Sequence, residues 1–405
     1  MKRAVLVLVA ACGTETSTME QGITEAVKRE RLTLIREAAA EMGVTNAALL
    51  AGIAKSETEL SHCYSEASFA SCPGPASPSC NGEPIMAGGA DGPCSAMQGG
   101  LGMFQFDAGT YAETLATYGA PVLTIEGNTA QAVAFVVDKV ILEVDGVADW
   151  RAATAWMNRI PLAAGEPLAE TWGKLIACRY NGCCSTSATC MTRARRYRDH
   201  AIQLYTEMGA AFWDTASRCA GLPEGGIIDQ RTDCYVAGGE PRYWRRESTG
   251  YGDSREWTSS TMARAPANFG QWRIVVPGPG TYHLDVHVTG GGAKAAKYQI
   301  AHAGVVDTVT IDQTTVDGFV SLGAFAFTGE GDEYVLLGDN TGTRDQKVVF
   351  DALRVTTPDD IGDDIDGDSD SQGGCGCGST RAPDAAVAFA VLAFALRRRR
   401  QTTQA

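Results

Sequence analysis

The sequence predicts a multidomain protein in which an α-rich domain precedes an all-β sandwich of jelly-roll-like form. The chain of 405 residues is too long for one ordinary hydrophobic core. Apolar residues recur at helical spacing up to about residue 213 and alternate with polar residues after residue 222. The apolar fraction of 44% is that of a globular protein. We therefore expect two folded domains, with processed segments at both ends.

The first domain, residues 23–222, is predicted from two helical patterns and from a contrasting segment between them. Apolar side chains recur every three to four residues at Ile23, Val27, Ile35, Ala38 and Met42, and again at Val133, Val136, Val137, Val140 and Val144. Residues 61–100 are instead rich in Ser, Pro, Gly and Cys, which interrupt helices. We interpret this insertion as a long ordered loop that disulfides hold in place.

The second domain, residues 225–357, is predicted from alternation with a period of two. Tyr282, Leu284, Val286 and Val288 alternate with polar residues, and a Pro-Gly-Pro-Gly turn precedes them. Shorter strands are expected at residues 297–303, 307–311, 319–327, 334–337 and 348–355. Regular short strands without helices indicate a β-sandwich.

Both ends of the chain have the composition of processed or unfolded segments. Residues 1–12 combine two basic residues with an apolar run that ends at Cys12, which is typical of an export signal, and residues 13–22 are read as a linker. Residues 9–12, Val-Ala-Ala-Cys, resemble the lipobox of bacterial lipoproteins, in which the cysteine is lipidated. A plain secretion signal with an incidental cysteine is the alternative. Either reading predicts export from the cytoplasm. We expect the protein in the cell envelope, anchored at the outer membrane or cell surface.

The formal net charge of −14 argues against a nucleic-acid partner, because phosphate backbones are bound by clustered Lys and Arg. An acidic surface also repels anionic lipid. Residues 358–380 form an acidic linker rich in Gly, Ser and Cys that is too polar to fold. The apolar stretch that follows, at residues 385–396, would span only about 18 Å as a helix, short of a bilayer core of roughly 30 Å.

Cysteine usage supports an oxidising compartment. Of 13 cysteines, Cys12 belongs to the signal and Cys375 and Cys377 to the tail, so 13 − 3 leaves ten between Cys63 and Cys234. An even number can form five disulfides, which persist outside the cytoplasm.

A metal site is the competing interpretation for four of these cysteines, Cys178, Cys183, Cys184 and Cys190. Adjacent cysteines suit tetrahedral zinc poorly, and the chain has no Cys-x-x-Cys pair. We therefore expect disulfides, no bound metal and no cofactor.

The residue with the clearest chemical potential is Glu57, on a helix predicted to start near Asn46. Counting back from Leu60 by threes and fours places Glu57 on the apolar face of this helix, whereas Glu59 lies off that face. A carboxyl group among apolar neighbours has a raised pKa, as a general acid requires. A solvent-exposed Glu paired with Lys55 is the alternative.

Two later segments add groups that could bind a ligand. Residues 98–105 place glycines around an apolar pair and end in Gln105, so that backbone can approach a ligand beside an amide. Residues 178–182 contain Tyr180 and Asn181 at a predicted helix end. An ordinary helix cap formed by Asn181 and Gly182 is the alternative for this segment.

In this order the three segments resemble the soluble lytic transglycosylase family, which has a lysozyme-like catalytic domain. Its Glu-Ser, Gly-Leu-Met-Gln and Ala-Tyr-Asn motifs correspond to Glu57-Thr58, to Gly102-Met103-Phe104-Gln105 and to Arg179-Tyr180-Asn181. The resemblance covers about residues 23–220.

The resemblance implies cleavage of the β-1,4 bond between N-acetylmuramic acid and N-acetylglucosamine in peptidoglycan, with a 1,6-anhydro product. Glu57 would act as the single acid and base. Tyr180 and Gln105 would orient the sugar, and Thr58 and Asn181 would support the cleft. Gly102, Met103 and Phe104 complete the predicted substrate-binding set.

Three departures from the family pattern leave alternatives open. The cysteine-rich insertion separates Glu57 from Gln105 by more chain than is usual. Residues 65–69 give a poorer second match to the Glu-Ser motif, so Glu66 is an alternative acid. Gln105-Phe106-Asp107 is similar to a motif of goose-type lysozyme, and a water positioned by Asp107 would make the enzyme a muramidase.

Residues 225–357 resemble the golvesin/xanthan-lyase carbohydrate-binding-like domain. The matching sequence segments include residues 298–304 and 308–313. This implies a polysaccharide ligand, for which Trp244, Trp257 and Trp272 are stacking candidates. A spacer domain without a ligand, with these tryptophans packed in its core, is the alternative. Residues 381–405, preceded by a Gly-Gly-Cys-Gly-Cys motif, resemble the myxobacterial C-terminal sorting tag, which implies a sorting protease as a partner.

We therefore predict a peptidoglycan lytic transglycosylase. The alternative from another class is a cell-surface glycan-binding protein whose lysozyme-like domain has lost activity.

Overall fold

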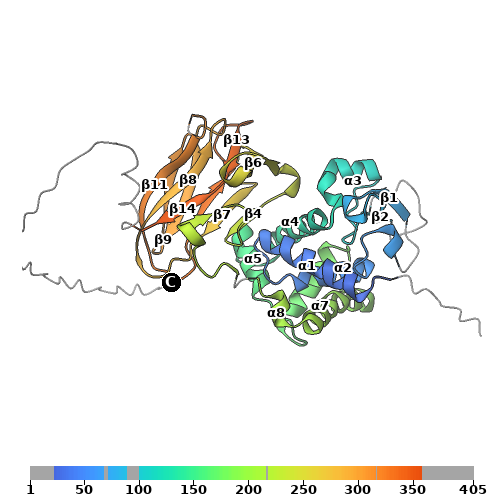
Figure 1. Cartoon of the computed structure of the whole chain (residues 1–405). Helices are drawn as coiled ribbons and strands as arrows, with labels where there is room; N and C mark the ends of the chain where they lie inside the picture. Colours follow the sequence, from blue (N-terminus) through green and yellow to red (C-terminus); the bar gives the residue numbers. More distant parts are fainter. Residues whose placement is uncertain (1–21, 68–71, 89–99, 216–217, 316, 358–405) are drawn as a thin grey trace, which may run out of the picture. The chain divides into compact units, whose positions relative to one another are not determined.

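The computed structural model describes residues 22–67, 72–88, 100–215, 218–315 and 317–357 (Figure 1). The predicted signal with Cys12, the acidic linker and the sorting tag lie outside these residues. A helical region, residues 25–213, precedes an all-β region, residues 227–356, as the sequence predicts. This confirms the fold class.

The helical region has helices at both stretches where apolar residues recur at helical spacing, residues 23–42 and 133–144. Helix α1, Glu25–Glu41, begins after Thr24, whose hydroxyl accepts a hydrogen bond from the Val27 N–H at 3.3 Å. Helix α2, Ala48–Thr58, ends where Glu59 adopts a left-handed conformation with φ 53°. The other helices are α3, Tyr111–Tyr118; α4, Ile125–Glu143; α5, Trp150–Asn158; α6, Pro167–Arg179; α7, Ala188–Met208; and α8, Ala210–Trp213.

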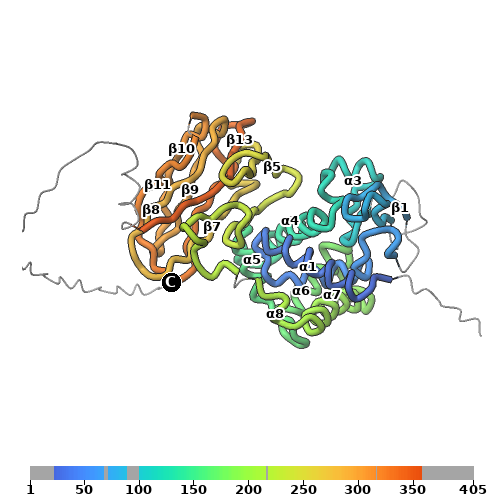
Figure 2. Tube along the Cα trace, viewed as in Figure 1, coloured from blue at the N-terminus to red at the C-terminus, as the bar shows by residue number. Residues whose placement is uncertain are grey.

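Helix α7 packs unusually closely against α2 and α6 (Figures 1 and 2). A Cβ on Gly52 of α2 would lie 2.7 Å from the Ala201 Cβ, and a Cβ on Gly173 of α6 would lie 2.4 Å from the Ala194 carbonyl oxygen. Only glycine permits this approach of backbones. Helix α7 is therefore held close to both α2 and α6.

The cysteine-rich segment differs from the predicted loop. Strands β1, Cys72–Ala76, and β2, Pro84–Ala87, form a two-stranded antiparallel sheet, with 3₁₀ turns at Tyr64–Glu66 and Pro78–Cys80. Prolines are compatible with this sheet because β1 pairs only with β2 and Pro84 is the first residue of β2, positions where a missing N–H costs little. The Ser, Pro, Gly and Cys composition of the segment therefore did not indicate its two strands.

The described cysteines of the folded region are oxidised, which confirms the disulfide prediction for them. Four pairs are formed, and Cys72 is also disulfide-bonded, whereas Cys94 lies outside the described residues. The pairs are Cys63–Cys80, Cys178–Cys184, Cys183–Cys190 and Cys219–Cys234. The metal alternative for the cluster at residues 178–190 is therefore wrong, since all four thiols are in disulfides.

The all-β region contains three antiparallel sheets. Their strand orders are β10-β9-β12-β7-β4, β11-β8-β14-β3 and β13-β6-β5. The strands are β3, Ile227–Ile228; β4, Tyr235–Gly238; β5, Arg245–Glu247; β6, Arg255–Ser259; β7, Phe269–Arg273; β8, Gly280–Thr289; β9, Ala296–His302; β10, Val305–Ile311; β11, Asp317–Phe327; β12, Tyr334–Gly338; β13, Lys347–Phe350; and β14, Leu353–Thr356.

The alternation predicted for residues 282–289 is confirmed in β8. Its apolar side chains are buried and its polar ones are partly exposed. Leu284 and Val286 share one core with Trp272 of β7 and Ile300 of β9, so the two larger sheets pack through their apolar faces. Trp272 is 1% exposed and therefore cannot stack on a ligand.

The strands of the structure differ from the predicted ones in two ways. Strands β3 to β7 were not foreseen, since most are too short to show alternation. The strand expected at residues 348–355 is two strands, because Asp351 turns into the interior between them. Its buried carboxylate accepts hydrogen bonds from the Ala352 N–H at 3.0 Å and the Tyr251 N–H at 3.2 Å, and it pairs with His287 Nδ1 at 2.9 Å. No helix among the described residues is long and apolar enough to cross a bilayer.

Candidate active site

Glu57 lies near the carboxyl end of α2, on the face that the sequence predicts. Leu49, Ile53 and Ser56 are buried and Glu57 is half-buried. Glu59 is exposed and pairs instead with Lys55, at 3.3 Å between Nζ and Oε2. The carboxyl group of Glu57 is therefore neither in the core nor free at the surface.

One polar partner of Glu57 comes from α7. The Tyr197 hydroxyl donates a hydrogen bond to Glu57 Oε1, and Tyr197 is only 2% exposed. Burial, followed by the negative charge of Glu57, raises the pKa of Tyr197. The hydroxyl consequently stays protonated and always acts as the donor toward Glu57.

Asn181 and Arg193 extend this contact into a directed chain of hydrogen bonds. Asn181 Nδ2 donates to the Tyr197 oxygen at 3.2 Å, and the Arg193 guanidinium donates to Asn181 Oδ1. Every donor in the chain points toward Glu57, so each bond polarises the next. The arrangement holds one carboxylate oxygen of Glu57 in a fixed place.

The glycine-rich turn at residues 102–105 contacts both other predicted segments. Thr58 Oγ1 donates to the Met103 carbonyl at 3.1 Å, and the Tyr180 hydroxyl donates to the Phe104 carbonyl. Gln105, at φ 52°, turns its side chain back so that Nε2 donates to the Gly102 carbonyl at 2.7 Å. The three predicted segments therefore meet in space.

The predicted substrate-binding residues take different positions at this meeting point. The Met103 and Phe104 side chains are fully buried, so only their backbone could reach a ligand. Thr58 is also fully buried and serves to hold the turn. Gln105 remains partly exposed.

Tyr180 is fixed by its ring as well as by its hydroxyl. The ring meets the Phe135 ring edge-on at 5.4 Å between centroids and lies 6.4 Å from the Phe106 ring. Burial, followed by the charge of Glu57, raises the pKa of Tyr180. The end of α6 is linked to the acid through Asn181, next to Tyr180, which donates to the same Tyr197 hydroxyl that bonds Glu57.

Asn128 organises the turn and was not foreseen from the sequence. It is fully buried in α4, where Nδ2 donates to the Leu101 and Val122 carbonyls at 3.2 and 2.9 Å and Oδ1 accepts from the Phe104 N–H at 3.0 Å. A Cβ on Gly102, which has φ 72°, would lie 2.8 Å from Asn128 Nδ2. Glycine is thus required at position 102 for two reasons.

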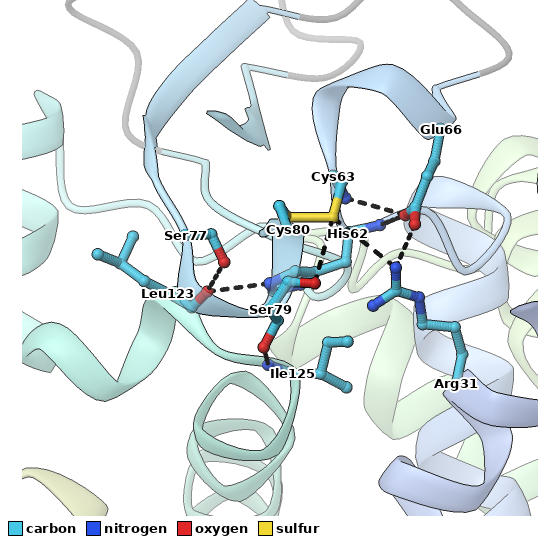
Figure 3. The surroundings of a disulfide bond; sticks show 9 residues. All are labelled: Arg31, His62, Cys63, Glu66, Ser77, Ser79, Cys80, Leu123 and Ile125. Atoms are coloured by element: carbon cyan, nitrogen blue, oxygen red, sulfur yellow. Dashed lines mark hydrogen bonds and ion pairs between the residues drawn. A yellow bond between two sulfur atoms is a disulfide. The ribbon is translucent and has the colours of Figure 1, made fainter. Parts of the chain in front are cut away.

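Glu66, the alternative acid, is occupied by structural contacts (Figure 3). Its Oε2 accepts the backbone N–H groups of His62 and Cys63 at 2.9 and 3.0 Å, and its Oε1 pairs with Arg31, which is buried. These contacts fix the start of the cysteine-rich segment. Glu66 is therefore held in place by contacts within the helical domain.

The cysteine-rich segment is bound to the start of α4 beside the Cys63–Cys80 disulfide (Figure 3). Ser79 Oγ accepts the Ile125 N–H at 3.1 Å, and the Ser77 hydroxyl donates to the Leu123 carbonyl. His62 Nε2 lies 3.0 Å from the same carbonyl oxygen. Since α4 carries Asn128, the insertion supports the helix that organises the turn.

Asp107, the predicted water-positioning residue, is exposed next to the turn. Its Oδ1 accepts the Gly109 N–H at 2.7 Å, which closes a local turn. Within the described residues, no three His, Cys, Asp or Glu side chains are grouped to bind a metal ion.

Sequence reasoning missed Tyr197, Arg193 and Asn128 as site residues. A tyrosine four residues after an arginine on a polar helix carries no local signal of its role. Asn128 is one of three buried polar side chains in the first half of α4, with Thr129 and Gln131, and the sequence does not distinguish it from them.

Comparisons with known proteins concern the β-sandwich. Residues 227–357 match the family described as the Golvesin C-terminal domain. This confirms the resemblance predicted for residues 225–357. A search with the whole chain found no match among curated protein sequences.

One solved structure, a Paenibacillus xanthan lyase, is 20% identical, with a TM-score of 0.29. The match covers 32% of this chain and 12% of that chain. The lysozyme-like resemblance of residues 23–220 remains a prediction.

Proposed function

We propose that this protein is a peptidoglycan lytic transglycosylase in which Glu57 is the acid and base. The observation that carries the proposal is the meeting of the three predicted segments around one half-buried carboxyl group. Glu57 is bonded to Tyr197, Thr58 holds the Met103 carbonyl, and Tyr180 holds the Phe104 carbonyl.

In the proposed reaction Glu57 first donates its proton to the glycosidic oxygen as the bond from the anomeric carbon to that oxygen breaks. The resulting carboxylate then accepts the proton of the C6 hydroxyl, whose oxygen bonds to the anomeric carbon and closes the 1,6-anhydro ring. One carboxyl group suffices, because each proton that it gives is returned. No second catalytic acid is needed.

The surrounding groups would act by positioning. Tyr197 holds Glu57 Oε1 and so fixes the orientation of the carboxyl group that exchanges the proton. Asn181 and Arg193 would hold Tyr197. Asn128 would hold the glycine-rich turn against which the sugar would lie. Positioning within a fraction of an ångström supports proton transfer.

The β-sandwich and the disulfides agree with an exported enzyme that acts on a polymer. Four disulfides in the described residues are expected of a protein outside the cytoplasm. We propose that residues 227–357 bind polysaccharide and so raise the local concentration of a polymeric substrate. Lipidation at Cys12 and processing of the C-terminal tag would attach the protein to the cell envelope.

The test is digestion of purified sacculi by the full-length protein and by Glu57→Gln. We expect Glu57→Gln to lose glycan cleavage while keeping its folded circular dichroism spectrum, because glutamine cannot donate a carboxylic proton. Glu59→Gln is the matched control, since Glu59 lies two residues away and is exposed. It should retain activity.

Mass spectrometry of the products separates the reaction types. Anhydro ends, lighter by one water than hydrolysed ends, support the transglycosylase, whereas hydrolysed ends that depend on Asp107 support a muramidase. Cleavage that survives Glu57→Gln contradicts the assignment of the acid. Absence of cleavage by the wild-type protein, with retained binding, identifies a glycan-binding protein.

A further inference from the structure

Two arginines of α7 flank the candidate acid. Arg193 and Arg196 lie three residues apart and share a helix face with Tyr197. Arg193 donates to Asn181 Oδ1, and Arg196 NH2 donates to the Ser56 carbonyl at 2.6 Å, one residue before Glu57. Both side chains are exposed.

The partners of these two guanidinium groups are neutral. A guanidinium has five N–H donors, and one donor of each is used, on an amide and on a backbone carbonyl. In the described part of the chain neither group is in an ion pair. Other arginines of the helical region do pair with carboxylates, namely Arg31 with Glu66, Arg179 with Glu143 and Arg198 with Glu170. Arg195, also on α7, donates instead to the Thr192 hydroxyl.

This positive charge is at odds with the rest of the protein. The formal net charge is −14, so acidic groups are plentiful, yet these two guanidinium groups beside Glu57 have none as a partner. Exposed donors in planar pairs are suited to carboxylates, which they bind through two parallel hydrogen bonds. A neutral sugar chain would not need them.

We propose that Arg193 and Arg196 form a carboxylate-binding site beside Glu57 that recognises the acidic substituents of the glycan strand. This inference rests on the proposed function. In peptidoglycan the carboxylates are those of the stem peptides and, on peptide-free strands, of the lactyl group of N-acetylmuramic acid. Chitin oligosaccharides have the same β-1,4 linkage and no carboxylate, so they are the neutral comparison.

The experiment measures binding, so that it does not depend on turnover. Full-length Glu57→Gln is titrated calorimetrically with peptide-bearing strands, peptide-free strands and chitin oligosaccharides. Adding Arg193→Gln and Arg196→Gln together should weaken binding of at least one acidic strand about 10- to 100-fold and reduce its dependence on salt. Binding of chitin oligosaccharides should change less than about 2-fold.

Three comparisons make the test specific. Arg159→Gln removes one exposed arginine at the end of α5 and should change nothing. Arg193→Lys with Arg196→Lys keeps the charge and should restore part of the affinity, which a loss of folding would not allow. The acidic strand whose binding falls identifies the lactyl or the stem-peptide carboxylate.

Equal loss of affinity for chitin oligosaccharides and acidic strands would overturn the inference, as would unchanged binding of both acidic strands. Either result leaves the proposed function standing, because that proposal depends on cleavage by the Glu57 protein. Cleavage that survives Glu57→Gln removes the catalytic assignment without deciding the binding result.

Discussion

Protonation of His62 should destabilise the helical domain as the pH falls. His62 is fully buried, its Nε2 lies 3.0 Å from the Leu123 carbonyl, and its Nδ1 has no partner among the described residues. Burial, reinforced by the charge of Arg31, lowers the pKa of His62 to about 4, although the Leu123 carbonyl opposes the shift. The folded state therefore holds this imidazole neutral.

The size of the effect follows from the difference between the folded and unfolded pKa values. The unfolded chain binds a proton at about pH 6.5, whereas the folded chain does so only near pH 4. Because the folded pKa is depressed, stability is complete above pH 6.5 and declines as the pH falls toward 4. With ~1.4 kcal/mol for each pH unit, the loss attributable to His62 is about 3 kcal/mol.

Urea unfolding of the wild-type protein and of His62→Gln at pH 7.5 and pH 4.5 measures this loss. Far-ultraviolet circular dichroism reports mainly on the helical domain. We expect the free energy of unfolding to fall by about 2–3 kcal/mol more in the wild type than in His62→Gln, because only the wild type must take up the extra proton on unfolding. Equal pH dependence of the two proteins would refute the reasoning, whatever the stability of His62→Gln at neutral pH.

Two further substitutions test the contacts around Glu57. Tyr197→Phe keeps the buried ring but removes the hydroxyl that holds Glu57, so cleavage of sacculi should fall roughly 10- to 150-fold, the equivalent of ~1.5–3 kcal/mol for a hydrogen bond to a charged group. Unchanged kcat/KM in that variant would show that Tyr197 is only structural. Asn128→Ala removes the partner of two buried backbone groups, the Phe104 N–H and the Val122 carbonyl, while the Leu101 carbonyl keeps its bond from the Phe106 N–H. The free energy of unfolding should therefore fall by ~2 kcal/mol or more, whereas exposed Glu126→Ala should change it by less than about 1 kcal/mol.

Much of the architecture followed from local patterns. The period of α2 placed Glu57 on the apolar face and Glu59 off it, and the alternation of β8 assigned its buried residues. Such patterns work because the side-chain directions of a single helix or strand are set by its own backbone. Segments whose structure depends on distant partners were predicted less well. Examples are the two strands within residues 72–87, which were predicted as a loop, and the single strand predicted at residues 348–355, which is two strands separated at Asp351.

What the sequence by itself determined is the order of an α-rich domain and a β-sandwich, the oxidised cysteines and the three segments that carry the candidate site. Only the tertiary structure decided which side chains join them. Tyr197 reaches Glu57 because Gly52 and Gly173 let α7 approach α2 and α6, and Asn128 reaches the glycine-rich turn from near the start of α4. These contacts join residues far apart in the chain, and their geometry depends on how whole helices pack, which no local spacing encodes.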